Sequence, residues 1–227
     1  MTVARRLLMR EPRLRNVRGV GIAACWAICV TVVAELGLTV GAWQITLAGE
    51  SVLTGTELSA GDVVLLAAVV MWALGSLAAA VLFIVWLLRA RENSEFLCDG
   101  KHSYARAWGG VGWFVPVAAL WVPGRFVQQV AAASDPRIGA RDAWIQNVKD
   151  STVSVWWGFW IISFVANFLS VRVSGGSGDV LGVGALLLLT ISTVTGGLAG
   201  VFAVLVIRMI NRRQSARNPV PWWHAPA

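Results

Sequence analysis

The sequence is short of charged residues, and this shortage excludes an ordinary soluble domain. Charged residues make up 14% of the 227 residues, whereas hydrophobic residues make up 57% and the mean hydropathy is +0.68. A soluble domain of this length carries more charge and fewer apolar residues. The composition therefore predicts an integral membrane protein.

Cysteine and histidine are too scarce for a disulfide framework or a metal centre. Of three cysteines, Cys25 and Cys29 lie one helical turn apart in an apolar run, and Cys98 lies in a polar stretch. The spaced pairs of an exported, disulfide-bonded domain are missing, and no histidine or acidic residue accompanies Cys25 and Cys29 as a further metal ligand. We expect packing roles for both, with no metal and no cofactor.

Catalytic motifs are missing as well. The sequence contains no His-Glu-x-x-His, no Gly-x-Ser-x-Gly and no phosphate-binding loop. The two histidines, His102 and His224, lie outside the apolar runs. An intramembrane enzyme is therefore the least supported class, and we assign no catalytic residue.

The net charge of +7 does not indicate nucleic-acid binding. The basic residues flank apolar runs instead of forming a stripe on a soluble fold, which excludes a nucleic-acid partner. Arginine and lysine beside apolar runs are typical of the cytoplasmic loops of membrane proteins.

Four apolar runs are long enough to cross a bilayer, which requires about 20 residues. They cover about 20–43, 63–88, 153–171 and 180–207. The sequence thus predicts an all-α integral membrane protein with four transmembrane helices. We divide it into a basic cytoplasmic arm (1–19), a membrane domain (20–210) and a cytoplasmic tail rich in proline and tryptophan (211–227).

The distribution of positive charge predicts the topology. Six arginines precede the first run, eight lysines and arginines fall between the second and third, and four follow the last. The other two loops together hold only Arg172. Both termini and the amphipathic segment 89–152 are therefore expected in the cytoplasm, with the protein in a plasma membrane.

One stretch inside that segment, from Trp108 to Arg125, is apolar enough for a membrane but is broken. Pro116, Pro123 and several glycines interrupt it, which disfavours a straight spanning helix. A fifth span would also place the C-terminal arginines outside. We expect a re-entrant hairpin or a helix lying in the interface, and the sequence leaves both open.

Glu35 is the only ionisable residue deep in a predicted span. Such residues usually face the bundle interior and find partners. Asn167 and Thr190 lie at comparable depths, so the three predict an intramembrane polar cluster. A protonated Glu35 that hydrogen-bonds other helices is favoured over a proton or cation relay, because a relay normally needs more than one titratable group.

Aromatic and basic residues around the broken stretch predict an interfacial or partner surface. Tryptophan with arginine at an inner interface suits anionic inner-leaflet lipids. The first functional reading is a non-enzymatic module that binds a protein or lipid partner at the cytoplasmic face. The alternative is a small transporter or channel component that uses Glu35. The surface residues are Arg106, Trp108, Trp113, Trp121, Arg125, Arg137, Arg141 and Trp144.

Five short patterns occur in order along the chain: Trp86–Asn93, Gly110–Ala118, Leu120–Pro123, Ala133–Pro136 and Val155–Trp157. Their order and spacing resemble an uncharacterised family of multi-span membrane proteins from high-GC Gram-positive bacteria, a domain of unknown function. The resemblance covers roughly Val63 to the end of the fourth span, with Ala119 and Gly124 departing from the family pattern. It implies a bacterial plasma-membrane location and no established activity.

Overall fold

The computed structural model describes residues 14–48, 60–100, 102–139, 148–174, 182–217 and 220–224. Within these ranges the chain is helical and no strand occurs. Four helices are long and apolar enough to cross a membrane, which confirms the predicted all-α architecture. They are α2 (Arg18–Ala48), α3 (Ala60–Leu97), α6 (Ser151–Ser174) and α7 (Val183–Ala216).

The helix α3 continues nine residues beyond the predicted end of the second span, to Leu97. Arg91 and Glu95 stabilise this extension as an i,i+4 ion pair with an N–O distance of 2.7 Å. At 1.5 Å per residue, α3 is roughly 57 Å long, whereas the hydrocarbon core of a bilayer is about 30 Å thick. Several turns of α3 therefore project beyond a bilayer core.

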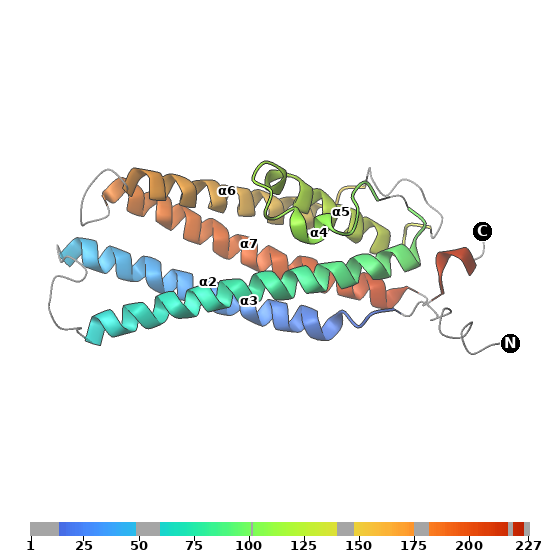
Figure 1. The fold of residues 1–227 in the computed structure, drawn as a ribbon, viewed down its shortest axis with the longest axis horizontal. Coiled ribbons are helices and arrows are strands. Elements are labelled where there is room, and N and C mark those ends of the chain that lie inside the picture. The colour runs from blue at the N-terminus through green and yellow to red at the C-terminus, as the bar shows by residue number, and fades with distance from the viewer. Residues whose placement is uncertain are drawn as a thin grey trace.

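The four long helices form two antiparallel pairs, α2 with α3 and α6 with α7, and α2 also packs along α7 (Figure 1). Gly200 allows the contact between α2 and α7. A Cβ at this position would lie 2.9 Å from a methyl carbon of Val32 and 3.2 Å from one of Ile28. A larger residue at 200 would push these helices apart.

The densest packing lies at the end of the bundle where α2 begins and α7 ends. Trp86, Phe126 and Ile210 are fully buried there. Towards the other end, α3 exposes large apolar side chains, such as Leu74 at 63% and Leu77 at 62%. Apolar exposure of this extent on a long helix is expected for a surface that faces lipid.

The chain between α3 and α6 forms three short helices, α4 (Trp108–Val111), η1 (Ala118–Leu120) and α5 (Val122–Ser134). Pro123 lies in the first turn of α5, where the missing N–H costs no helical hydrogen bond. Most of α5 is buried against the long helices. The segment leaves the end of α3, runs beside α6 and returns to the same end of the bundle, so it adds no fifth crossing (Figure 1).

Candidate functional site

The chain that links α3 to α6 forms the central segment. Its tip, around Trp113, packs between these two helices through aromatic rings. The indole of Trp113 meets Phe83 of α3 edge-on at 5.9 Å between centroids and Trp160 of α6 edge-on at 5.6 Å. The rings of Phe83 and Trp156 lie 5.7 Å apart and join α3 to α6 directly. These contacts form an aromatic cluster that joins α3, α6 and the chain between them.

A cavity of about 430 Å³ lies beside this cluster. Its lining comes from all four long helices and from the tip of the central segment, and it is mostly small or aromatic. The polar lining residues are few: Thr31, Glu35, Ser76 and Ser163. The aromatic lining residues are Phe83, Trp113, Phe114, Trp156 and Trp160.

Glu35 extends from α2 towards α7 at this cavity. Its carboxyl oxygens lie 3.7 and 3.8 Å from the position that a Cβ on Gly196 would occupy, so the glycine leaves room for the carboxyl. No hydrogen bond or ion pair joins this carboxyl to any residue that the structure describes. The nearby hydroxyls of Thr31 and Ser163 bond to main-chain oxygens of Ala27 and Ser192. The carboxyl is therefore available to a ligand.

A wider groove of about 790 Å³ runs along the outside of α2 and α3. Its lining is aliphatic throughout, with Leu66, Met71 and Leu74 among the residues, and it holds no polar group. A groove without a polar anchor fixes no ligand orientation, so it is a weaker candidate for a ligand site than the cavity.

The predicted cluster of Glu35, Asn167 and Thr190 does not form. Thr190 accepts a hydrogen bond of 2.9 Å from the indole of Trp43, and Asn167 is exposed on the outer face of α6. No hydrogen bond joins any two of the three residues. The sequence indicates the position of Asn167 along its helix but not the direction in which its side chain leaves the helix.

Threonines, and not Glu35, supply the polar contact between α2 and α7. The hydroxyls of Thr39 and Thr193 lie 2.7 Å apart, one turn along α2 from Glu35. Together with the bond from Trp43 to Thr190, this contact performs the interhelical role that the sequence assigned to Glu35.

The structure divides the predicted surface residues into three groups. Trp113 points into the aromatic cluster and is half-buried, so it is not part of a surface. The exposed members on the described segment are Arg106, Trp108, Trp121, Arg125 and Arg137. The last two, Arg141 and Trp144, lie outside the described residues.

Two of these exposed arginines are held by carboxylates. Arg106 donates to Glu95 at 2.6 Å, and this contact raises the pKa of Arg106. Arg137 forms a two-pronged pair with Asp135, with N–O distances of 3.0 and 2.7 Å. Their charges are therefore partly neutralised within the protein, which weakens their attraction for anionic lipid.

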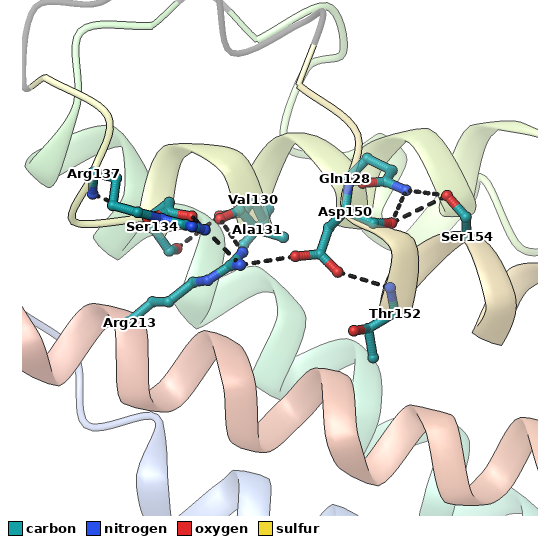
Figure 2. Close-up of polar contacts among 10 residues, drawn as sticks. Gln128, Val130, Ala131, Ser134, Arg137, Asp150, Thr152, Ser154 and Arg213 are labelled. Carbon is teal, nitrogen blue, oxygen red and sulfur yellow. Dashed lines mark hydrogen bonds and ion pairs between the residues drawn. The ribbon is translucent and has the colours of Figure 1, made fainter.

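A polar network at the buried end of the bundle was not foreseen. Figure 2 shows Arg213 of α7 reaching Asp150, 2.8 Å away, and the main-chain oxygen of Ala131 on α5, 3.2 Å away. Asp135 lies 3.4 Å from the same guanidinium. The hydrogen bonds from Arg137, together with the nearby charge of Arg213, lower the pKa of Asp135 to about 2. This network fixes α5 and the start of α6 to the last turns of α7.

Two more residues near the end of α7 extend the network. Gln214 donates to the main-chain oxygen of Ala90 and to the hydroxyl of Ser134. Arg217 donates to main-chain oxygens of Leu97, Asp135 and Ile138, and its burial lowers its pKa. Arg213 and Arg217 therefore join the end of α7 to neighbouring parts of the chain.

His102 is half-buried beside Arg91 and Glu95, with both ring nitrogens turned away from solvent. Neither ring nitrogen of His102 has a hydrogen-bond partner among the described residues. Burial, together with the positive charge of Arg91, lowers the pKa of His102 to about 4, so the ring is neutral at physiological pH. The guanidinium of Arg91 lies over the ring of Phe126, 5.2 Å from its centroid, in a cation–π contact.

The fold and the site together define a class: a helical multi-span membrane protein with a carboxyl-bearing cavity between its spanning helices. Residues 50–215 match the family described as a domain of unknown function (DUF4328), and the chain belongs to it. No curated protein and no solved structure matches the chain.

Proposed function

We propose that this protein binds a small hydrophobic molecule within the membrane, in the cavity between α2, α3, α6 and α7. One observation carries the proposal: the Glu35 carboxyl borders an apolar and aromatic cavity and has no hydrogen-bond partner among the described residues. Ligand sites are typically concave and mostly apolar, with a few polar groups that fix orientation, and they measure roughly 300–1,000 Å³. A cavity of about 430 Å³ suits a small organic molecule.

This proposal places the protein in the transporter or carrier class, at a bacterial plasma membrane with both termini in the cytoplasm. The distribution of arginine supports the orientation. Arg212 and Arg213 lie near the end of α7 and Arg172 lies near the end of α6, at opposite ends of this antiparallel pair. Binding of a protein partner only at the cytoplasmic face has less support, because Trp113 packs inward and Arg106 and Arg137 are paired.

We further propose that the central segment is re-entrant and that its tip lies among lipid. The side chains around the tip are apolar and exposed: Val111 at 52%, Phe114 at 78% and Val117 at 64%. Such side chains at the level of Phe83 and Trp160 favour hydrocarbon over water. The exposed Trp108, Trp121 and Arg125 then suit anionic headgroups, the lipid partner expected from the sequence.

Saturable photolabelling tests the binding proposal. The probe is a benzyl group carrying a photoreactive diazirine, prepared in a cationic form with a trimethylammonium group and in a neutral form with tert-butyl in its place. Labelling in lipid nanodiscs, by at least one form, should saturate on peptides that contain Trp113 and Trp160. Labelling of lipid-facing residues of α3 should rise linearly with probe concentration, because those positions have no site to fill.

Two neighbouring alanines supply a matched pair of variants. Ala79 lines the cavity, whereas Ala78 lines the outer groove between α2 and α3. Ala79→Leu should reduce the saturable labelling, and Ala78→Leu should leave it unchanged. If neither form of the probe gives saturable labelling of the cavity peptides, the proposed function is wrong.

A further inference from the structure

We propose that the cavity selects an organic cation, whose positive charge lies between the Glu35 carboxylate and the indole rings of Trp113 and Trp160. This inference rests on the proposed function and names the class of ligand. It depends on three features of the cavity: a single acidic group, a wall of aromatic rings and the scarcity of other polar atoms.

The carboxyl supplies the negative charge, and no basic residue of the described cavity lining pairs with it. Glu35 is the only titratable group among the described cavity-lining residues of α2, α3, α6, α7 and the segment tip. Arginine and lysine are missing from that lining, so no protein cation neutralises it. An unpaired carboxylate at membrane depth is costly, and a bound cation would remove that cost.

The aromatic wall favours a cation with organic substituents. The rings of Trp113 and Trp160 stand edge to face at 81°, so they present surfaces in two directions. The face of a tryptophan ring attracts a cation within about 6 Å, and the attraction is strongest where water is excluded. Aromatic walls are a known means of recognising quaternary ammonium groups.

The same lining disfavours a metal ion. Hard cations such as Ca²⁺ require about six to eight oxygen ligands. Beside the Glu35 carboxyl the lining offers only the hydroxyls of Thr31, Ser76 and Ser163, and those of Thr31 and Ser163 already bond to main-chain oxygens. No group of three or more potential metal ligands occurs among the described residues.

Binding of a cation beside Glu35 is expected to displace a proton from its carboxyl. In the empty cavity the Glu35 carboxyl holds a proton, because no residue of the lining compensates a charge there. Binding of the cation L⁺ releases that proton, and the carboxylate and L⁺ remain as a neutral pair. The proton and the cation therefore compete for one carboxyl, which predicts stronger cation binding as the pH rises.

The experiment compares the cationic and neutral forms of the benzyl probe, without irradiation, by equilibrium dialysis against protein in nanodiscs. The two forms differ only at the charged centre. The cation should bind the wild type more tightly than the neutral form. Glu35→Gln should weaken cation binding by about tenfold to hundredfold, the range expected for loss of one charged contact, and leave neutral binding unchanged.

Two further variants define the site. Asp99→Asn, a control that removes an exposed carboxylate outside the cavity, should change neither affinity. Trp160→Leu should weaken binding of the cation about three- to tenfold and affect the neutral form less. Proton release on cation binding, measured in weak buffer, should occur in the wild type and not in Glu35→Gln, which separates loss of the charge from a misfolded variant.

Each remaining outcome contradicts a different statement. If both forms bind the wild type equally and Glu35→Gln changes neither, the cation inference is wrong while the binding cavity stands. If neither form binds the wild type, the cation inference and the proposed function are both wrong. Cation binding without proton release would also contradict the inference, because the carboxyl would then not be the competing group.

Discussion

Gly124 lies directly beneath the indole ring of Trp157, and a Cβ at residue 124 would meet three atoms of that ring at 2.8 Å. The ring has little freedom to withdraw. It stacks on Trp160 at 4.7 Å between centroids, and its N–H donates to the main-chain oxygen of Leu120 at 3.2 Å. The glycine therefore sets how closely α5 approaches α6.

Gly124→Ala should lower the free energy of unfolding by about 1–3 kcal/mol, the usual cost of overpacking a well-packed site. Gly110→Ala is the matched control, because its Cβ would meet Ile84 at 3.7 Å, an ordinary contact. Thermal or denaturant unfolding in detergent measures both variants. Equal effects of the two substitutions would contradict the close packing of α5 on α6.

Arg213 joins α7 to α5 and to the start of α6 through Asp135, Asp150 and Ala131. Arg213→Gln should lower the free energy of unfolding by about 3 kcal/mol, because it leaves two carboxylates without this partner. The site is poorly solvated, since the arginine side chain is only 17% exposed. Arg212→Gln changes the neighbouring, exposed arginine and should be nearly neutral. Limited proteolysis between α5 and α6 should increase only in the Arg213 variant.

His102 predicts an acid-dependent loss of stability. Its pKa is about 4 in the folded protein and near 6.5 when unfolded, so below pH 6.5 the unfolded chain binds a proton that the folded chain excludes. The free energy of unfolding should therefore decrease as the pH is lowered from 6.5 to 4, by up to about 3 kcal/mol in total. His102→Leu should remove this part of the pH dependence. If the free energy of unfolding of that variant falls with decreasing pH as steeply as that of the wild type, His102 is not the group responsible.

Cysteine labelling tests the proposed orientation. Cys98 is 2% exposed and is a poor reporter, so the test uses a cysteine-free background into which single cysteines are introduced elsewhere. Ser215→Cys should react with a membrane-impermeant reagent only after cells are opened. Ser51→Cys and Ser177→Cys, in the two short loops predicted to face outward, should react in intact cells. The reverse pattern would invert the topology, and labelling of Ser51 and Ser177 from opposite sides would contradict four spans.

The long helices could be predicted from the sequence because each apolar run has about the 20 residues, or more, that a helix needs to cross a bilayer core. The extension of α3 was missed, since Arg91 and Asn93 look like the start of a loop until their partners are known. Asn93 bonds to Gln214 and to the main chain at Arg15, residues distant in sequence. Only the folded chain brings these groups together.

The cavity could not be predicted, because runs that are apolar on all sides do not indicate which face meets which neighbour. Asn167 illustrates this: Ala166, one residue earlier, is buried, and Ser163 bonds to Ser192 of α7. A step of one residue turns the side chain by about 100°, which directs Asn167 outward. Glu35 itself could be identified as an unusual intramembrane acid, whereas its neighbour Gly196 gave no comparable indication.

The position of a bound cation tests the proposed site most directly. Crystals grown with benzyltrimethylarsonium, an arsenic analogue of the cationic probe, allow the charged centre to be located by anomalous diffraction. We expect an arsenic peak in the cavity, between the Glu35 carboxyl and the rings of Trp113 and Trp160. An empty cavity with the arsenic bound only at the protein surface would contradict the proposed site.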